Sequence, residues 1–311
     1  MRTILHSRPL ASALRLAGLA LLAACAGDAP NDPLDLDTES DMLDSRSADR
    51  HKVSVCHKPD RGGTILRIGA PALDAHLRHG DYVARLLVDQ ASPVSGDGVL
   101  FATIGAALDA ARSGRLARGE LVSAACRITI AVAAGTYPGV PNAEPAAGQE
   151  RFPLLVDVPD ITLRGAMEMT LDGAGRATGE AEGGAESVLS PASPLPVVAG
   201  ASTPVIIANA HPGGSAGHGL VVKGFVFRSG HTTTAGGQGV LSVRANDLRI
   251  RGNRFEAGFT ESIDVRGGSA VVLENHLSGT AGTCDVCFGA PGTFRAVGNR
   301  LLAGGIPGFT V

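Results

Sequence analysis

The sequence predicts an all-β protein, built as a solenoid of stacked parallel coils and preceded by a small module that contains cysteine and histidine. Between Gly219 and Leu302 similar segments recur with a period of slightly more than twenty residues. Asn253, Asn275 and Asn299 occupy corresponding positions in these segments. The apolar residues of these segments alternate, as on strands with one buried face. The 311 residues include 42 Gly and 18 Pro but no Trp, which favours many short turns over a helix bundle. Units of this size bury their inner faces only by stacking, so the repeat predicts a solenoid.

Residues 1–24 are predicted to be a lipoprotein signal peptide. Three arginines and no acidic residue accompany the apolar run Leu16–Ala24, which is too short to span a bilayer. The stretch Leu22-Ala23-Ala24-Cys25 resembles a bacterial lipobox, so Cys25 is the expected site of lipidation. Because Ala26 follows instead of an aspartate, the resemblance implies a lipid anchor at the outer membrane or cell surface. The alternative is an ordinary export signal with an incidental cysteine.

Residues 25–50 are predicted to be an acidic, disordered tether. Between positions 28 and 50 eight acidic residues stand against two arginines, with little apolar surface to offset the cost of ordering. The whole chain carries a net charge of −3, and the positive signal peptide and the acidic tether leave residues 51–311 neutral. A neutral folded part with few aromatic residues lacks a basic surface, so we expect no nucleic-acid partner.

Residues 51–88 are predicted to form a small Cys/His module. The stretch 55–59 (VCHKP) opens it, and the stretch 72–82 (ALDAHLRHGDY) closes it. These residues resemble a small module of secreted and surface bacterial proteins, with a V-C-H-x-P opening and an A-H-L-x-H-G-D close. The resemblance implies no function. The second cysteine that this module usually has soon after H-G-D is absent from this chain.

Four side chains of the module form a candidate Zn²⁺ site: Cys56, His57, His76 and His79. His76 and His79 are three residues apart on an expected short helix that ends at Gly80, which places both rings on one face. One thiolate and two or three imidazoles suit a tetrahedral zinc ion. The alternative is that the histidines hydrogen-bond Asp81 and backbone carbonyls, and so stabilise a module too small for a core of its own. A catalytic role is the third hypothesis.

An amphipathic helix is expected over Thr103–Arg112, with Thr103 as its N-cap and with apolar residues at helical spacing. The apolar face consists of Ile104, Ala107, Leu108 and Ala111. A strand at 127–132 and a turn at 133–137 follow. Leu171–Gly200 lacks periodicity and is predicted to be a long loop between coils.

The helix, the strand–turn pair and the stretches 150–156 and 160–165 resemble the pectin-lyase-like proteins, and in particular an uncharacterised bacterial branch of them. The resemblance implies a single-stranded right-handed parallel β-helix over residues 97–311, with the helix as its N-terminal cap. It implies no activity, since that superfamily mixes lyases, hydrolases, esterases and non-enzymes. The chain has no clear counterpart of the family's three-aspartate hydrolase set, nor of its Ca²⁺ cluster with a catalytic base.

A second set of strands aligns Ser242, Asp264 and Asp285, at offsets close to the period of the asparagines. Alternation predicts that these side chains point outward, together with Arg244, Arg266 and Cys287, while Leu241, Val243, Ile263, Val265, Cys284 and Val286 point inward. Asp264 and Asp285 are then neighbours on an exposed sheet. Two such carboxylates share a proton, bind a cation such as Ca²⁺, or divide acid and nucleophile roles on a glycoside.

Asp264 and Asp285 are therefore the candidate catalytic residues, with Ser242, Arg244 and Arg266 as candidate ligand-binding residues. Arg244 and Arg266 are suited to hold a uronate carboxylate. The alternative is that the aspartates pair with these arginines on a solvated surface.

Two further predictions concern the repeats. Asn253, Asn275 and Asn299 are expected to stack as an amide ladder at the turns, where asparagine tolerates a left-handed φ. Cys284 and Cys287 are expected on opposite faces of one strand. The pairing of these two with Cys56 and Cys126 stays open.

The leading functional hypothesis is a monomeric, surface-anchored bacterial lipoprotein whose solenoid binds a polysaccharide or glycan surface. Its contact with the membrane is expected through the lipid anchor only. The first alternative is a polysaccharide lyase or glycoside hydrolase, and the second is a structural or protein-interaction scaffold. Whether the protein is an enzyme stays open at this point.

Overall fold

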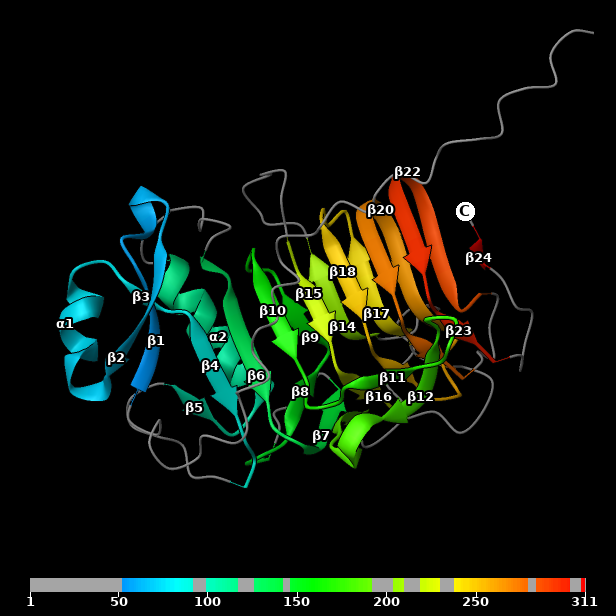
Figure 1. The fold of residues 1–311 in the computed structure, drawn as a ribbon, viewed down its shortest axis with the longest axis horizontal. Helices are drawn as coiled ribbons and strands as arrows, with labels where there is room; N and C mark the ends of the chain where they lie inside the picture. Colours follow the sequence, from blue (N-terminus) through cyan, green and yellow to red (C-terminus); the bar gives the residue numbers. More distant parts are fainter. Residues whose placement is uncertain are drawn as a thin grey trace, which may run out of the picture. The chain divides into compact units, whose positions relative to one another are not determined.

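The computed structural model describes residues 52–91, 99–116, 126–141, 146–191, 204–209, 219–229, 238–278, 284–302 and 309–310 (Figure 1). The predicted signal peptide with Cys25, and the predicted tether, lie outside these residues. The described part is mostly β-structure with long parallel sheets, which confirms the all-β prediction. No helix of the described part is long and apolar enough to cross a membrane.

A three-stranded antiparallel sheet opens the described chain. Its strands are β1 (Lys52–His57), β2 (Thr64–Gly69) and β3 (Tyr82–Val83), in the order β2-β1-β3. The short helix α1 (Leu73–Arg78) lies between β2 and β3, and one-turn helices at Pro59–Arg61 and Ala70–Ala72 complete the connections. Val53, Val55 and Leu73 form a small buried cluster of their own. The sheet and α1 correspond to the predicted Cys/His module.

The rest of the described chain passes repeatedly through three columns of parallel strands. The first column contains β4 (Arg85–Val88), β6 (Ile128–Val132), β10 (Ile161–Arg164), β15 (Val221–Lys223), β18 (Leu248–Arg251) and the second halves of β20 (Glu261–Leu273) and β22 (Val286–Val297), with β5 (Leu100–Phe101) beside β4. The second contains β7 (Gly135–Pro141), β13 (Ser187–Pro191), β16 (Phe225–Phe227), β19 (Arg254–Phe255), β21 (His276–Leu277) and β23 (Arg300–Leu301), with β8 (Glu150–Phe152) beside β7. The third contains β9 (Leu154–Val156), β14 (Pro204–Asn209), β17 (Gln238–Val243), the first halves of β20 and β22, and β24 (Phe309–Thr310).

The chain passes through the three columns in a constant order. From β15 onward the chain runs through the first, second and third columns in turn, and each strand pairs in parallel with the corresponding strand of the next pass. We call one such pass a coil. The long strands β20 and β22 bend from the third column into the first, so these two columns form one curled sheet. β4, which lies inside the predicted module, is already a strand of this sheet because it pairs with β6.

Asparagine amides connect successive coils at the turn between the first and second columns. Asn253 Nδ2 donates to Asn275 Oδ1 at 3.0 Å, and Asn275 Nδ2 donates to Asn299 Oδ1 at 2.9 Å. The predicted ladder is confirmed, but its expected backbone reason is wrong. Positive φ belongs to the residue before each asparagine, with values of 59° at Gly252 and 54° at Glu274. Asparagine is needed at these positions for its side-chain hydrogen bonds and not for its tolerance of a positive φ.

Phenylalanine rings fill the interior of these coils. Phe227 and Phe255 stack with centroids 4.5 Å apart, and Phe225 and Phe259 meet them edge to face. All four side chains are at most 1% exposed. The rings belong to one continuous apolar core that extends through the stacked coils.

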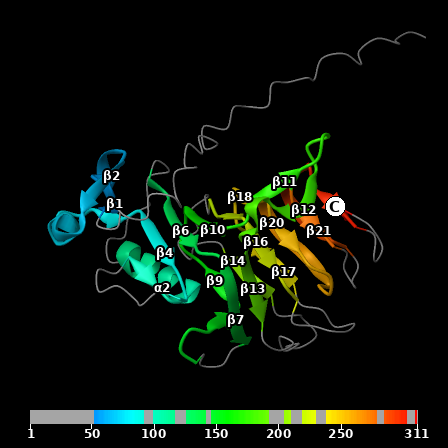
Figure 2. The ribbon, with the colours of Figure 1, turned by 60° about the horizontal axis from the view of Figure 1, so that its bottom comes forward.

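Helix α2 (Ile104–Leu116) packs against β4, β5 and β6 of the first column and against β9 of the third (Figure 2). Its four predicted apolar residues are buried, and Thr103 Oγ1 accepts a hydrogen bond from Ala106 N at 3.2 Å, so the amphipathic helix and its N-cap are confirmed. Buried Glu150 adds a second cap, because its carboxylate accepts from Ile104 N at 2.6 Å and Gly105 N at 3.0 Å. Burial raises the pKa of Glu150, although these two N–H groups act to lower it.

The predicted loop over residues 171–200 is wrong in its described part. β11 (Met169–Leu171) and β12 (Ala177–Ala181) form an antiparallel hairpin, a one-turn helix follows at Glu182–Gly184, and β13 is a strand of the second column. Residues 192–200 lie outside the described residues. β13 escaped prediction because so short a strand does not show periodicity.

Two disulfides settle the open pairing of the cysteines. Cys56 of β1 is bonded to Cys126, directly ahead of the first-column strand β6, with Cα atoms 5.7 Å apart. Cys284 is bonded to Cys287 with Cα atoms 5.8 Å apart. The expected opposite orientation of Cys284 and Cys287 is wrong because β22 begins at Val286, so Cys284 lies in the bend before the strand.

Candidate functional site

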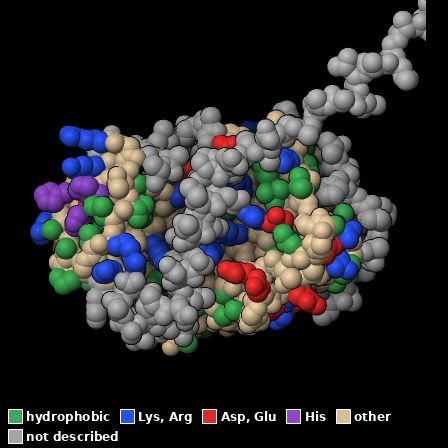
Figure 3. Space-filling model, viewed as in Figure 1, with side chains coloured by type: hydrophobic (Ala, Val, Ile, Leu, Met, Phe, Trp, Pro, Cys, Tyr) green, Lys and Arg blue, Asp and Glu red, His purple; other side chains and the backbone are tan. Residues whose placement is uncertain are grey.

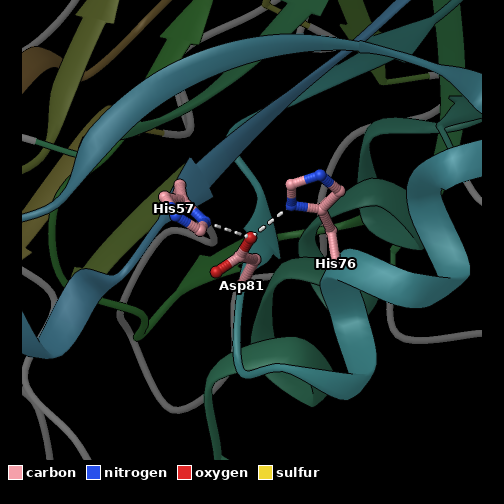
Figure 4. A group of neighbouring side chains, drawn as sticks. All are labelled: His57, His76 and Asp81. Carbon is pink, nitrogen blue, oxygen red and sulfur yellow. Dashed lines mark hydrogen bonds and ion pairs between the residues drawn. The ribbon is translucent and has the colours of Figure 1, made fainter.

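Two imidazole rings and one carboxylate converge in the small module, and we call them the His–Asp cluster: His57, His76 and Asp81 (Figure 4). His57 ends β1, His76 lies in α1, and Asp81 directly precedes β3. Asp81 Oδ2 lies 2.8 Å from His57 Nδ1 and 2.5 Å from His76 Nδ1. The ring centroids are 5.7 Å apart and the ring planes make an angle of 74°. One carboxylate oxygen therefore holds both rings.

Asp81 is the buried centre of the cluster. Its side chain is 1% exposed, whereas those of His57 and His76 are 31% and 25% exposed. Asp81 Oδ1 accepts a hydrogen bond from the backbone N–H of Lys58 at 3.1 Å. Burial raises the pKa of the Asp81 carboxyl, but the hydrogen bonds from both histidines and from Lys58 outweigh it, and the pKa lies below its ordinary value. Both oxygens of this carboxylate are thus fixed in orientation.

The predicted zinc ligands need two corrections. Cys56 supplies no thiolate because it is bonded to Cys126, and it is fully buried on the face of β1 opposite to His57. His79 is exposed beyond the end of α1 and is not part of the cluster, whose ligand atoms lie within 4.8 Å of one another. The hydrogen bonds to Asp81 match the structural alternative. Figure 3 shows histidine side chains gathered on the surface of the module.

An open groove lies where three successive coils bend from the third column into the first, and we call it the bend groove. Its volume is about 1020 Å³, and four glycines at positions 267, 268, 289 and 292 form much of its lining. The other lining side chains are Val243, Arg244, Asn246, Arg266, Ser269 and Thr293. Both predicted ligand-binding arginines therefore lie on one groove.

Close stacking of backbone makes the floor of this groove. Gly268 pairs with Gly292 in the next coil, and a Cβ atom at Gly292 would lie 1.8 Å from Gly268 O. A Cβ atom at Gly268 would lie 2.0 Å from Ala245 O. Only glycine fits at both positions, so the floor presents peptide groups instead of side chains.

Arg244 and Arg266 differ in their surroundings. Arg266 binds Asp264 Oδ2 through Nε at 2.8 Å and through Nη2 at 2.7 Å. In the described part of the chain Arg244 has no ion-pair partner, and its side chain is exposed. Its φ of 57° is unusual for a residue other than glycine, and such strained positions cluster at functional sites. Among the described residues, the groove thus has one guanidinium paired with a carboxylate, that of Arg266, and one without an ion-pair partner, that of Arg244.

The predicted outward row of Ser242, Asp264 and Asp285 is wrong. Leu241, Asp264 and Cys287 are paired with one another in successive coils and occupy one row. Ser242 pairs with Val265 in the inward row and is 0% exposed, so it does not reach the outer face. Val243, predicted inward, pairs with Arg266 and is 37% exposed.

The two candidate catalytic aspartates are neither directly adjacent nor exposed. Asp285 precedes Val286, the partner of Ile263, so it stands two positions out of register with Asp264. With coils about 4.8 Å apart and about 3.3 Å per residue, their Cα atoms are about 8 Å apart. Asp264 is 6% and Asp285 3% exposed. Asp264 Oδ2 also accepts a hydrogen bond from Gln238 Nε2 at 2.7 Å, so the alternative of aspartate–arginine pairing holds for Asp264 and Arg266.

Sequence reasoning missed two features of these sites. Asp81 was expected only as a hydrogen-bond acceptor and not as a ligand, although its place directly after His79 and Gly80 was an available signal. The groove glycines and Thr293 were missed because the bends inside β20 and β22 interrupt the alternation. In comparisons with known proteins, no family model, no curated protein and no solved structure matches the chain.

Proposed function

We propose that the chain from β4 onward is a right-handed parallel β-helix, as its resemblance to pectin-lyase-like proteins implies, and that the bend groove binds an acidic carbohydrate. The constant order of the three columns supports the solenoid. Right-handed connection between parallel strands is by far the commoner hand. We also propose, from the lipobox-like stretch Leu22–Cys25, that the protein is a bacterial lipoprotein attached through Cys25 to the outer membrane or cell surface.

The observation that carries the binding proposal is the presence of Arg244 and Arg266 on one groove. A guanidinium presents several N–H donors in a planar fork that matches a carboxylate or sulfate group. Ser269 and Thr293 line the same groove, and their hydroxyl groups offer donors and acceptors for sugar hydroxyls. The groove is open, with a volume of about 1020 Å³, so it has room for several sugar units along the coils.

Acidic sugar is favoured over neutral sugar by the composition of the groove. The chain has no tryptophan, and no aromatic side chain lines the groove, so stacking on sugar rings is absent from its described lining. Charge-assisted hydrogen bonds are roughly twice as strong as neutral ones. Affinity would therefore come mainly from carboxylate or sulfate groups of the ligand.

Binding fits this groove better than catalysis by Asp264 and Asp285. A retaining glycosidase needs two carboxyl groups about 5 Å apart that both reach the sugar. The two aspartates here are buried and diagonal to each other. A lyase or hydrolase, and a protein-interaction scaffold, are the competing functions.

The test is a binding screen with the mature chain on acidic and neutral oligosaccharides. We expect retention on uronate or sulfate polymers, and loss of at least tenfold in affinity in Arg244→Gln and Arg266→Gln. Arg151→Gln on β8 changes the net charge equally at an exposed position away from the groove lining, and serves as the control. Preference for neutral glycans, or equal weakening by Arg151→Gln, would contradict the proposal. Release of reducing or unsaturated ends would establish the enzyme alternative.

A further inference from the structure

We propose that the His–Asp cluster is a binding site for one divalent transition-metal ion, with zinc as the best-fitting ion. His57, His76 and Asp81 each offer one ligand atom, and these atoms lie within 4.8 Å of one another. Asp81 Oδ2 is 2.8 Å from His57 Nδ1 and 2.5 Å from His76 Nδ1, so we take these three as the ligand atoms. The site lies in the small module, so it is independent of the bend groove and of any carbohydrate ligand. It uses a ligand set different from the predicted Cys56, His57, His76 and His79.

The donor set selects the class of ion. Two imidazole nitrogens and one carboxylate oxygen suit zinc, cobalt, nickel or copper, whereas Ca²⁺ and Mg²⁺ prefer all-oxygen sites. Three protein ligands leave at least one coordination position for water or for an external group, as in zinc sites that react with ligands. Calcium is therefore disfavoured at this cluster.

The N···O distances in the His–Asp cluster show how far the ligand atoms must move to bind an ion. The N···O separations of 2.8 and 2.5 Å are hydrogen-bond lengths. Tetrahedral zinc with bonds of about 2.0–2.1 Å requires ligand atoms about 3.3 Å apart. An ion therefore replaces the protons shared between each Nδ1 and Asp81 Oδ2, and each ring moves outward by about 0.5–0.8 Å to reach that spacing.

The surroundings permit this movement in the rings and hold the carboxylate still. Both histidine side chains are a quarter to a third exposed, so they can shift toward solvent without repacking the core. Asp81 is buried, and its second oxygen is held by Lys58 N at 3.1 Å. Its own N–H donates to His76 O at 3.2 Å, which fixes it against the end of α1. Such hydrogen bonds to a ligating carboxylate are the usual support of a metal site.

The framework of the site is rigid on the β1 side. His57 follows Cys56, whose disulfide to Cys126 ties β1 to the segment just before β6. β1 is also paired along its whole length with β2. The backbone of His57 and the carboxylate of Asp81 are thus held in place before any ion binds, and only the histidine rings have to move, which lowers the entropy cost of binding.

The test is titration of the full mature chain with ZnCl₂ under a competing chelator, with Co²⁺ absorption as an independent readout of tetrahedral coordination. We expect one equivalent per chain, and affinity at least about tenfold lower in His57→Ala, His76→Ala and Asp81→Asn. His79→Ala is the matched control, because His79 is the neighbouring exposed histidine outside the cluster, and it should bind like the wild type. Arg244→Gln should also leave zinc binding unchanged, which separates this test from that of the groove.

Folding of each variant is checked by circular dichroism and by the intact Cys56–Cys126 disulfide. If His76→Ala fails to fold, His76→Gln replaces it, since glutamine keeps a hydrogen-bond donor for Asp81 but supplies no imidazole. Folded wild-type protein that binds no zinc at micromolar concentration would overturn the proposal. Equal weakening by His79→Ala and His76→Ala, or a Co²⁺ spectrum typical of octahedral aquo cobalt, would overturn it as well.

Discussion

The guanidinium of Arg266 is bonded to the carboxylate of Asp264, two residues earlier on the same strand, by contacts of 2.8 Å from Nε and 2.7 Å from Nη2. The aspartate is buried, whereas the arginine side chain is 57% exposed and lies on the bend groove. Asp264 thus has two roles: it is packed in the buried part of β20, and it partly neutralises the charge of Arg266 on the groove. Asp264 was predicted to be catalytic, but in the structure it reduces the positive charge that a ligand would contact.

Asp264→Asn should therefore separate the effect of Asp264 on stability from its effect on ligand binding. Removing the carboxylate charge leaves Arg266 without its partner, so affinity for acidic oligosaccharides should rise. Loss of the charge-assisted contacts should lower the free energy of unfolding by about 1–3 kcal/mol. Binding titration and urea unfolding measure the two effects. If Asp264 were a catalytic acid or nucleophile, the variant would lose turnover and gain no affinity.

Asn275→Ala should destabilise the protein strongly. Its side-chain amide donates to Ile250 O, Leu273 O and Asn299 Oδ1, and its Oδ1 accepts from Asn253, all in a buried turn. We expect a loss of about 3 kcal/mol, because buried donors and acceptors are left unpaired. Chemical denaturation measures it.

Asn299→Ala is the matched control for this ladder. Asn299 makes the same kinds of bonds but is partly exposed, so water can replace them. Its loss should be about 1 kcal/mol. Equal costs at both positions would show that the ladder contributes through the turn backbone and not through buried amides.

His276 should make stability depend on pH. It lies in β21 under the hairpin, with Gly179 against its ring and the guanidinium groups of Arg254 and Arg300 nearby, while Glu186 pairs with Arg254. Burial lowers its pKa, the two arginines lower it further, and a hydrogen bond with the Ala177 backbone acts in the opposite direction. The folded state therefore binds this proton less readily than the unfolded state, and stability contributed by the neutral ring is lost as pH falls below about 6.5.

The measurement compares wild type with His276→Gln by thermal unfolding between about pH 7.5 and 5.5, a window that brackets the ordinary histidine pKa. Other histidines titrate in both proteins, so the difference curve isolates His276. The wild type should lose more stability on acidification than the variant. Parallel curves would mean that the ring is protonated as easily in the fold as in the unfolded chain.

The two disulfides should contribute unequally. Cys56 and Cys126 have a sequence separation of 70, whereas that of Cys284 and Cys287 is 3. Loop-closure entropy gives about 4 kcal/mol for the long loop and about 2 kcal/mol for the short one. Calorimetry of the two double Cys→Ser variants tests this ranking. Greater destabilisation by removing the short disulfide would contradict it.

The repeat and the asparagine ladder could be predicted from the sequence, because the same residue type recurs once in every coil. The asparagine amides reveal the coil length because each must lie over the next. Alternation failed for Ser242, which is buried and pairs with inward Val265. The alignment of polar residues between coils was also wrong, because the coils pair Asp264 with apolar Leu241 and with Cys287. Position along a coil is set by the bends, which sequence spacing does not show.

Only part of each candidate site could be predicted, because sequence spacing does not show contacts between distant segments. His57 and His76 were identified as candidate ligands, but the disulfide partner of Cys56 is far along the chain, at a sequence separation of 70, and was not readable from local spacing. Arg244 and Arg266 were identified as a pair on one face. The glycine floor beneath them depends on contacts between coils, at positions 268 and 292, that no single segment encodes.

The most direct test of the central claim is a calorimetric titration of an acidic oligosaccharide, such as an oligogalacturonate, into the mature chain and into its Arg244→Gln/Arg266→Gln double variant. We expect saturable binding at one site, weakened by added salt, and its loss in the double variant. The double variant should remain folded by circular dichroism but melt at a lower temperature, because Arg266→Gln removes the contacts to buried Asp264. Arg151→Gln should bind as the wild type does. Undiminished binding by the double variant, or no binding by the wild type to any acidic oligosaccharide, would contradict the assignment of the bend groove.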